Sequence, residues 1–301
     1  MDHSHYGYSA LPKRAQEQRS TAARLQAFVV LCLEHWVALP PIDSLRDPRF
    51  VGEFGSFTPD YRSWTQREYG LRIGVFRVLD ALKAQGIRPA IAANAAAVQR
   101  LPELVDTLNT WGCEWIGHAE AASAMVHTGL TLVQQADVVA QSLKTIASCT
   151  GHKPLGWLSQ DWGTTPDTYK LLAQAGIRYT LDWTNDDQPY WLHTEPGIAA
   201  IPLSAEWDDV QCQWLRNLDP RSHAQLALGA FDRLRMEAIE QQRPLAFGLT
   251  LHPWVCGMSS RIGPLRQLLA DMHSRPNVNW TQPADIFHNF QQNDRHENRR
   301  T

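Results

Sequence analysis

Residues 88–118 read RPAIAANAAAVQRLPELVDTLNTWGCEWIGH, and this stretch indicates a strand, a helix and a second strand in direct succession. The run at 88–94 is apolar and ends on Asn94. The stretch 101–112 has apolar residues at helical spacing, with a proline near its start and a glycine at its end. The run at 113–118 is again apolar and ends on His118. Two strands joined by a helix pair side by side in parallel, so a parallel sheet is expected.

The same alternation continues along the rest of the chain. Further strands are expected at 25–36, 154–161, 177–183, 197–206, 244–253 and 277–281. Further helices are expected at 74–86, 133–151, 165–176, 222–242 and 261–274. Seven or eight strand and helix repeats in one unit predict an α/β fold closed, or nearly closed, into a barrel.

No linker or low-complexity stretch divides the chain, so residues 1–301 are expected to form a single catalytic barrel domain. Its accessory parts are expected to be an N-terminal arm at 1–24, a long loop at 37–67 after the first strand, and a polar tail at 290–301. Long loops at strand ends often carry function.

Composition excludes several functional classes. With a formal net charge of −3, the chain has no strongly basic surface for nucleic acid. No apolar stretch approaches the roughly 18 residues that a membrane helix needs, and the first twenty residues lack the apolar core of a secretory signal. The five cysteines include no closely spaced pair, which is typical of a reduced, cytoplasmic protein. A small-molecule substrate is therefore expected, and self-assembly into a homo-oligomer is left open.

In barrels of parallel strands, the active site lies at the C-terminal ends of the strands. The residues at these ends are Glu34, His35, Asn94, His118, Asp161, Asp182, Glu206 and His252. A polar residue at a strand end is usually only the start of a loop, and this reading is preferred for Asn94, Asp161 and Glu206. Glu34 and His252 differ, because each ends a long apolar strand where desolvation shifts a pKa. Cys256 lies near His252, but no base is fixed beside it, so an inert thiol is expected.

Four stretches together resemble the polysaccharide deacetylases (carbohydrate esterase family 4), and most closely their branch of metal-independent allantoinases and cyclic imide hydrolases. They are YGLRIGVFRVLDAL (69–82), the stretch 88–118 quoted above, GWLSQDWGTTPDTYKLLAQAGIRYTLDWTNDDQPYWL (156–192) and LHPWVCGMSSRIGPLRQLL (251–269). The resemblance implies a distorted (β/α)7–8 barrel and hydrolysis of a carbon–nitrogen bond other than a peptide bond.

The resemblance also bears on a metal. Metal-dependent members carry two adjacent aspartates after the first strand, where this chain has Glu34 and His35. They carry His-x-x-x-His in a second motif, where this chain has His118 followed by Ala122. An alanine binds no metal, and a hydrolytic zinc site needs about three protein ligands. We therefore expect no cofactor; zinc or another divalent ion held by His35 and His118 is the weaker alternative.

The function expected on this basis is hydrolysis of a small cyclic amide, imide or ureide. Glu34 would activate or orient water, His252 would give a proton to the leaving nitrogen, and His118 would hydrogen-bond the carbonyl as charge develops on it. The residues expected to contact substrate, at strand ends or at the mouth of the site, are His35, Tyr69, Arg72, Asn94, Asp161, Trp162, Asp182, Trp183, Asp187, Glu206 and Trp254.

Two alternatives remain open from the sequence. The first is a metal-dependent deacetylase that removes acetyl groups from an amino sugar or polysaccharide. The second is a non-catalytic member of the fold that binds a ligand or partner, which the alanine at position 122 motivates. For His118, a structural role and a metal-ligand role stand beside the expected role in proton or hydrogen-bond chemistry.

Overall fold

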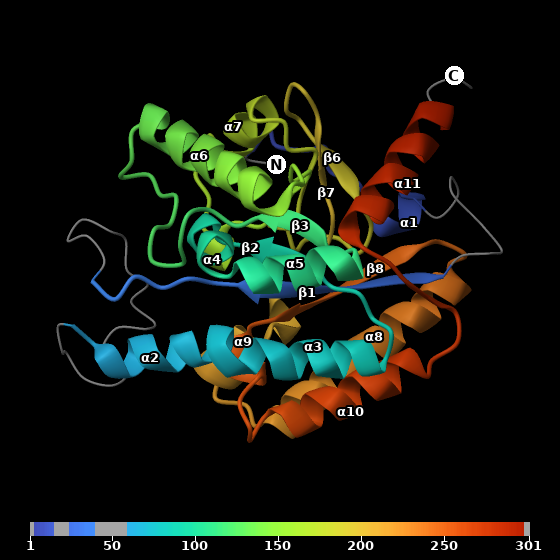
Figure 1. The fold of residues 1–301 in the computed structure, drawn as a ribbon. Coiled ribbons are helices and arrows are strands. Elements are labelled where there is room, and N and C mark those ends of the chain that lie inside the picture. Colours follow the sequence, from blue (N-terminus) through green and yellow to red (C-terminus); the bar gives the residue numbers. More distant parts are fainter. Residues whose placement is uncertain (1–2, 15–23, 40–58, 298–301) are drawn as a thin grey trace.

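A curled sheet of mostly parallel strands forms the centre of the computed structural model, which describes residues 3–14, 24–39 and 59–297 (Figure 1). The strands are β1 (Leu25–Leu33), β2 (Ala90–Ala93), β3 (Glu114–Gly117), β4 (Gly156–Trp157), β5 (Tyr179–Thr180), β6 (Tyr190–Leu192), β7 (Ile198–Ala200), β8 (Leu245–Leu251) and β9 (Val278–Trp280). Their order is β6-β7-β5-β4-β3-β2-β1-β8, with β9 added beside β1. Only the β6–β7 pair is antiparallel. The predicted α/β fold, a distorted barrel of parallel strands, is confirmed.

The barrel is open on one side. Among the described residues, no strand pairing joins β7 to β8. The segment just before β6 reaches across instead, where the backbone N–H of Ala246 donates to the carbonyl of Asp187 over 2.9 Å. This contact lies at the start of β8, and therefore at the end of the barrel opposite the C-terminal strand ends.

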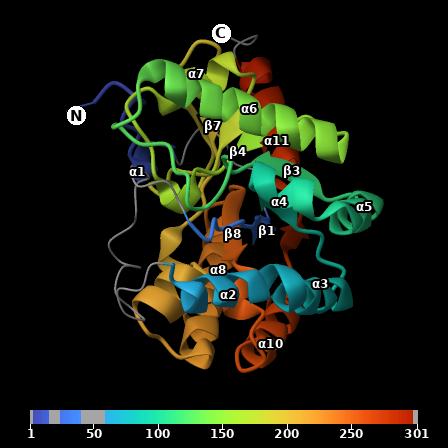
Figure 2. The same ribbon diagram turned by 60° about the vertical axis from the view of Figure 1, so that its left-hand side comes forward.

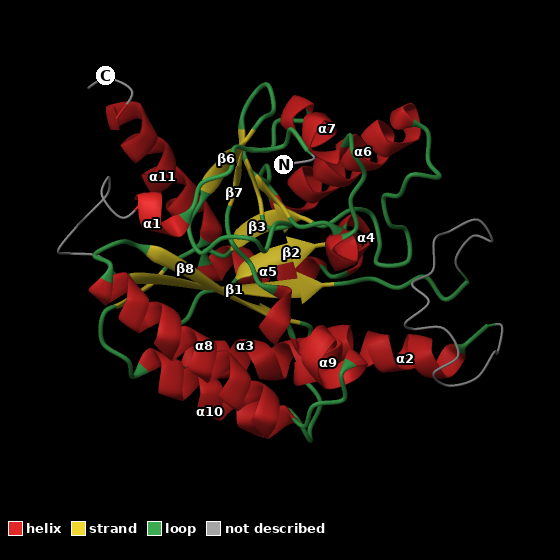
Figure 3. Cartoon of the chain, turned by 180° about the vertical axis from the view of Figure 1, so that it is seen from behind, coloured by secondary structure: helices red, strands yellow, loops and turns green. Residues whose placement is uncertain are grey.

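Helices cover the outside of the sheet in two groups (Figures 1 and 3). The group on one side contains α3 (Val75–Ala84), α8 (Pro220–Glu240), α9 (Pro253–Cys256) and α10 (Ile262–His273), with α2 (Tyr61–Tyr69) extending from it. The group on the other side contains α4 (Ala95–Arg100), α5 (Pro102–Trp111), α6 (Leu132–Thr150), α7 (Thr168–Gln174) and α11 (Pro283–Glu297). Figure 2 shows the two groups separated by the strands. None of the described helices is long and apolar enough to cross a bilayer.

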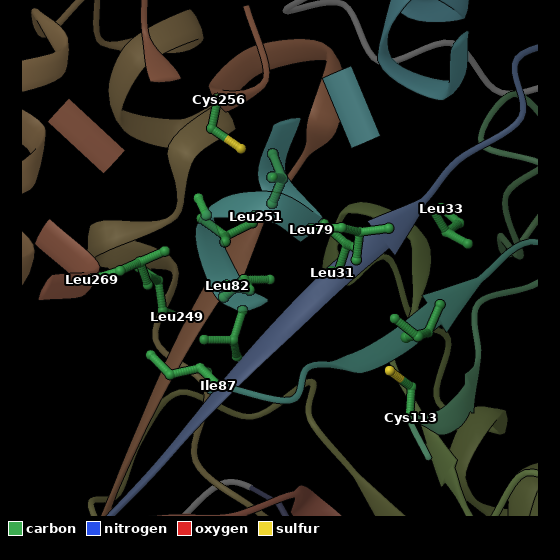
Figure 4. Packing of buried hydrophobic residues seen from close by; sticks show 14 of the residues in the cluster. Leu31, Leu33, Leu79, Leu82, Ile87, Cys113, Leu249, Leu251, Cys256 and Leu269 are labelled. Carbon is green, nitrogen blue, oxygen red and sulfur yellow. The ribbon is translucent and has the colours of Figure 1, made fainter. Parts of the chain in front are cut away.

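The side chains of β1 alternate between two cores. Phe28, Val30 and Cys32 belong to the cluster inside the barrel, which gathers residues from nearly every parallel strand. Leu31 and Leu33 belong to the cluster under α3, α8 and α10, where they pack with leucines of β8 and of these helices (Figure 4). Successive side chains of a strand point to opposite faces, so the inward and outward positions of each strand are fixed by counting in twos.

A π-helical turn, Gly70–Gly74, joins α2 to α3 and lies directly against α9. A Cβ at Gly70 would come within 2.6 Å of the backbone nitrogen of Trp254, and one at Gly74 within 2.2 Å of the carbonyl oxygen of Pro253. The two glycines are four residues apart, hence on one face of the helix. They therefore let the turn approach the backbone that carries Trp254.

The structure changes several sequence-based expectations. The stretch 37–67 contains the start of α2 at Tyr61, while residues 40–58 lie outside the described part. Residues 290–297, expected as a polar tail, continue α11. Within the N-terminal arm, Leu11–Arg14 form the short helix α1, and residues 1–2 and 15–23 are not described. Several strands are only two to four residues long.

Candidate active site

Three side chains meet at the C-terminal ends of the strands, and we call Glu34, His118 and His252 the central cluster. Each lies two residues beyond an inward position of its strand, namely Cys32 on β1, Ile116 on β3 and Thr250 on β8. The period of two therefore turns all three into the barrel. The Nε2 atom of His118 lies 3.7 Å, and that of His252 3.8 Å, from the same oxygen, Oε1 of Glu34.

The carboxylate of Glu34 is buried and held by two neutral donors. Gln160 donates from Nε2 to Oε1 over 2.5 Å, and the indole N–H of Trp254 donates to Oε2 over 3.0 Å. Burial alone would raise the pKa of Glu34, but the charge of His252, the nearby ring of His118 and the hydrogen bond from Gln160 outweigh it. The net effect lowers the pKa far below its usual range, so Glu34 is ionised across all working pH values.

His252 lies between carboxylates on both sides of its ring. Its Nδ1 donates to Oδ1 of Asp209 over 2.6 Å, and its backbone N–H donates to Oδ2 of the same side chain over 2.9 Å. Burial disfavours a charged imidazole, but Cys32 and the carboxylates of Asp208, Asp209 and Glu34 raise the pKa of His252 well above its ordinary value. The resting ring is therefore an imidazolium that has a proton to give from Nε2.

Asp208 adds a second carboxylate on the same side. Its Oδ2 lies 3.6 Å from Nδ1 of His252, and its Oδ1 accepts the backbone N–H of Gln211. Burial raises the pKa of Asp208 to about 7, with the charge of Asp209 adding to the effect and His252 opposing it. Sequence reasoning missed both aspartates. The two adjacent aspartates that follow Glu206 and Trp207 could have indicated the site. They lie in irregular backbone, however, so their direction could not be predicted from the period of a strand.

His118 has a defined tautomer when it is neutral. Its Nδ1 lies 2.6 Å from the carbonyl oxygen of Leu158, which can only accept, so Nδ1 carries the proton. Nε2 is then a lone-pair acceptor that faces Oε1 of Glu34. It is buried, and no described residue forms a hydrogen bond with it. The expected donation to a substrate carbonyl therefore requires the imidazolium form, whereas the neutral ring accepts a hydrogen bond from water or from a substrate N–H.

Two amide side chains, those of Asn94 and Gln160, hold the central cluster through hydrogen bonds. Asn94 accepts the backbone N–H of His35 over 2.9 Å and donates to the carbonyl of His118, which ties the ends of β1 and β3 together. Its amide also lies 3.4 Å from Oε1 of Gln160. Gln160 was missed by the sequence analysis, which selected Asp161. Leu158 belongs to the inner cluster, so counting by two from it reaches Gln160.

Aromatic rings line the side of Glu34 on which Trp254 lies. The guanidinium of Arg67 lies over the ring of Trp36 at 4.1 Å and over that of Trp254 at 5.2 Å. Trp214 packs edge-on against Trp254, with ring centroids 5.1 Å apart. This wall fixes the indole that donates to Glu34, since cation–π and edge-to-face contacts each favour one ring orientation.

His35 is directed away from the central cluster. It is out of phase with Glu34 on the same strand, and its Nε2 lies 3.2 Å from Arg100 while its Nδ1 lies 3.8 Å from Glu68. Burial, and then the charge of Arg100, lower the pKa of His35, with Glu68 opposing them. His35 therefore faces Arg100 and Glu68, whereas His118 faces Glu34.

The donor set does not match the metal-binding motifs described above for the metal-dependent members of the family that the sequence resembles. Ala122 offers no ligand atom, and His35 faces outward. In the described residues, the group of three side chains close enough to hold an ion is Asp208, Asp209 and His252. Two ligands about 2.1 Å from a tetrahedral ion lie roughly 3.4 Å apart, whereas Asp209 and His252 are in direct hydrogen-bond contact at 2.6 Å. That group is built as a proton-sharing pair with a second acid beside it.

Several expected substrate contacts lie elsewhere, and these expectations are wrong. Asp187 is near the start of β8, so the length of that strand, roughly 20 Å, separates it from His252. Glu206 is exposed and forms a two-point ion pair with Arg216 at 3.0 and 3.3 Å. Glu206 was chosen as the end of an apolar run and Asp187 for its place in the stretch LDWTNDDQPYW, and neither lies at an inward strand end.

The remaining expected contacts lie around the central cluster or on the surface. Asp182 accepts the backbone N–H and the hydroxyl of Ser159, at 2.6 and 2.8 Å, and so holds a loop. Trp183 packs in an aromatic group with Tyr6 and Tyr169.

On the helical side, the hydroxyl of Tyr69 accepts from Arg77, and Arg72 is exposed on the π-helical turn. Asp161 and Trp162 follow Gln160 with positive φ angles of 49° and 54°. Of the expected substrate-binding set, Trp254 bonds directly to the central cluster, and Asn94 through the carbonyl of His118.

Two buried thiols lie beside His252 and both stay protonated. Burial raises the pKa of Cys32 to about 11 and that of Cys256 well above its usual value. Cys256 donates to the backbone carbonyl of His252 over 3.3 Å. This agrees with the expectation of an inert thiol at Cys256.

Comparison with known proteins identifies the architecture. The structure matches the crystal structure of PuuE allantoinase with a TM-score of 0.80 and 24% sequence identity, covering 94% of this chain and 97% of that one. It matches a structure named as a polysaccharide deacetylase from Pseudomonas aeruginosa with a TM-score of 0.80 and 21% identity, covering 94% and 98%. The chain has the polysaccharide deacetylase fold.

Sequence comparisons point to the same superfamily, although they cover less of the chain. A Schizosaccharomyces pombe protein, whose name assigns it to the polysaccharide deacetylases, is 25% identical over 232 residues, 70% of each chain. The peptidoglycan deacetylase of Helicobacter pylori is 28% identical over 106 residues, 34% of this chain and 35% of that one. No protein-family model matches the chain. The resemblance noted from the sequence is thus supported for the superfamily.

Proposed function

We propose that this protein hydrolyses a carbon–nitrogen bond, other than a peptide bond, in a small cyclic imide, ureide or amide, without a metal. The observation that carries the proposal is the pair of imidazole Nε2 atoms, 3.7 and 3.8 Å from one buried carboxylate oxygen. These distances are too long for direct hydrogen bonds and suit groups that bind a third molecule between them. The similarity to an allantoinase structure supports the substrate class, and that to deacetylases supports the bond type.

Glu34 would orient and deprotonate the attacking water. An ionised carboxylate accepts a proton from water, and its fixed hydrogen bonds from Gln160 and Trp254 leave Oε1 directed at the two histidines. The low pKa of Glu34 makes it a weak base at rest. That weakness derives largely from the charge of His252, so the pKa of Glu34 rises when His252 gives its proton away.

His252 would supply that proton to the leaving nitrogen. The ring is charged at rest, and Asp209 holds Nδ1–H so that Nε2–H faces the reacting atoms. The proton that Glu34 takes from water and the proton that His252 gives to nitrogen balance, so ring opening yields a neutral amine or amide and a carboxyl group. Asp209 stabilises the imidazolium and orients it, in the manner of an acid–base pair held by a third group.

His118 would bind water or a substrate N–H through its Nε2 lone pair when neutral, and would donate to the carbonyl oxygen when protonated. Because no metal polarises the carbonyl in this scheme, a substrate whose carbonyl is already activated is favoured. Imides and ureides meet that requirement better than a plain acetamide does.

The runner-up is removal of acetyl groups from an amino sugar, which the names of the curated relatives favour. That reaction in this fold relies on a metal, and the ligand positions here are an alanine at 122 and an outward His35. The non-catalytic alternative is opposed by the buried, charged cluster around Glu34, which costs stability unless it serves binding or chemistry.

One screen separates these functions. Purified protein is incubated with a panel of five- and six-membered cyclic imides and ureides and, separately, with N-acetylated glucosamine oligomers, each with and without EDTA. We expect ring opening of an imide or ureide that EDTA leaves unchanged. Deacetylation that depends on added metal would establish the runner-up, and no turnover on either panel, with ligand binding detected calorimetrically, would establish the non-catalytic reading.

A further inference from the structure

Of the two neutral donors to Glu34, Gln160 makes the shorter hydrogen bond. Gln160 is buried, with 7% of its surface exposed. It opens a short helical turn, Gln160–Trp162, directly after β4. Its Nε2 donates to Oε1 of Glu34 over 2.5 Å, and Oε1 is also the oxygen that both histidines face.

The orientation of this amide is fixed by a chain of hydrogen bonds. The backbone N–H of His35 can only donate, so the Asn94 atom 2.9 Å away is its carbonyl oxygen. The Asn94 NH2 group then faces the carbonyl of His118 and, at 3.4 Å, Oε1 of Gln160. The NH2 group of Gln160 therefore donates to Glu34. In the whole series, from the backbone N–H of His35 through Asn94 and Gln160 to Glu34, each group donates to the next.

The backbone that follows Gln160 is strained in a way that supports a role for this position. Asp161 and Trp162 are consecutive non-glycine residues with φ of 49° and 54°. Left-handed conformation is tolerated by aspartate but is unfavourable for tryptophan. The turn is held by hydrogen bonds from Trp162 N to Ser159 O and from Gly163 N to Gln160 O. Its geometry directs the Gln160 side chain into the barrel.

We infer that Gln160 is a positioning residue for Glu34: its amide donates to Oε1 and aims this oxygen at the space between the two histidines. The donor is neutral, so it steadies the negative charge without adding a second cation that would compete with His252 for the role of acid. This inference rests on the proposed function for its catalytic meaning, but the contact itself can be tested without any substrate.

The test compares three variants. Gln160→Met keeps the length of the side chain and removes the donor, and Gln160→Glu places a second carboxyl group against Glu34. Gln135→Met is the matched control, because Gln135 is also buried and hydrogen-bonded. Its partners are the carbonyl of Leu130 and the hydroxyl of Thr165, so it belongs to α6 and to a hydrogen-bond network other than that of Glu34. Folding of each variant is checked by near-ultraviolet circular dichroism.

The first readout is the carboxyl carbon resonance of Glu34 in ¹³C-labelled protein without substrate, assigned by its loss in Glu34→Gln. We expect the apparent titration of Glu34 to move upward by about one pH unit or more in Gln160→Glu, because two adjacent carboxylates share a proton. A smaller upward shift is expected in Gln160→Met and none in Gln135→Met. Unmoved titration of Glu34 in both folded Gln160 variants would overturn the inference.

The second readout is the pH profile of kcat/KM on whichever imide or ureide is hydrolysed. Its acidic limb should move upward in the same order, with Gln135→Met matching the native protein. Activity that falls in Gln160→Met with an unmoved acidic limb, and equally in Gln135→Met, would mean that Gln160 is merely a packing residue. If nothing is hydrolysed, the proposed function fails while the resonance of Glu34 still decides the role of Gln160.

Discussion

His252 and Asp209 are joined twice, once through the ring nitrogen at 2.6 Å and once through the backbone N–H at 2.9 Å. One carboxylate therefore fixes both the position and the rotation of the ring. Asp209→Asn should lower activity by about 10²-fold or more, because the ring loses both its charge partner and its preferred orientation.

The same variant should also change the pH profile. The carboxylates raise the pKa of His252, so removal of one lowers it, and the alkaline limb of kcat/KM should shift to lower pH. Asp208→Asn is the comparison: it also removes a carboxylate that raises the pKa of His252, so its alkaline limb should shift too. Its turnover should fall less than that of Asp209→Asn, because Asp208 lies 3.6 Å away and does not hold the ring. An alkaline limb that stays in place in Asp209→Asn would show that another group supplies the proton.

Glu34→Gln and His252→Ala should each lose about 10²–10⁴-fold in turnover while remaining folded, since general acid–base catalysis contributes on that scale. Glu206→Gln is the matched control, because Glu206 is an exposed carboxylate paired with Arg216 and should leave turnover unchanged. Full activity in folded Glu34→Gln would remove Glu34 from the mechanism.

Treatment with EDTA, followed by addition of Zn²⁺, Mn²⁺ or Co²⁺, should leave the rate unchanged. Ala122 cannot bind a metal and His35 faces Arg100 and Glu68, so too few ligands converge on His118. Elemental analysis of the purified protein provides a second measurement. Loss of activity with EDTA and recovery with one of these ions would establish a metal enzyme and reassign His118 as a ligand.

Gly74→Ala should destabilise the protein by about 1–3 kcal/mol and reduce activity. A Cβ there would lie 2.2 Å from the carbonyl oxygen of Pro253, so α9 must move and carry Trp254 away from Glu34. Gly229→Ala on α8 is the control, because a Cβ there meets nothing within 4 Å. It should stabilise the protein by about 0.5–1 kcal/mol, as alanine does in exposed helical positions. Chemical denaturation measures both effects.

Glu114 predicts how stability depends on pH. It is half-buried at the start of β3, where it accepts hydrogen bonds from the hydroxyl of Tyr179 and from the backbone N–H of Ala284. Burial raises its pKa to about 7 from 4.5, so between these values the folded protein binds more protons than the unfolded chain does. Its contribution to the free energy of unfolding should therefore fall as pH rises through this window, by at most about 1.4 kcal/mol per unit.

Chemical denaturation at pH 5 and pH 7.5 checks this. The difference in stability between the two pH values should be smaller in Glu114→Gln than in the native protein, by more than about 1 kcal/mol. An identical pH dependence in both proteins would mean that Glu114 titrates normally.

The strands and the long helices could be predicted from the sequence, because each contains enough apolar residues to show the spacing typical of a strand or a helix. The sequence also predicted which ends would carry Glu34, His118 and His252, since parallel strands share one C-terminal edge. Gln160 could have been found by extending the inward count from Leu158, and His35 could have been set aside by the same count from Glu34.

Other parts were beyond such counting. Asp208 and Asp209 lie in an irregular segment between a 3₁₀ turn and a π-helical turn, where no period exists. The short strands β4 and β5 have two residues each, so the positions of Asp161 and Asp182 depend on a strained turn and a loop contact. The role of Gly70 and Gly74 depends on α9, which lies about 180 residues further along the chain.

The central position of β1 has a consequence for how the molecule is made. β8 covers one edge of β1 along residues 25–31, while β9 and β2 pair with the first and last parts of its other edge. The residues of β8 and β9 leave the ribosome more than 200 positions after β1. Until then the nascent chain displays an apolar strand, LQAFVVLCL, with one open edge, which is a template for association with other chains. Glu34 gains its partner His252 in the same late step, so the order of synthesis keeps the reactive centre unassembled until the barrel around it can close.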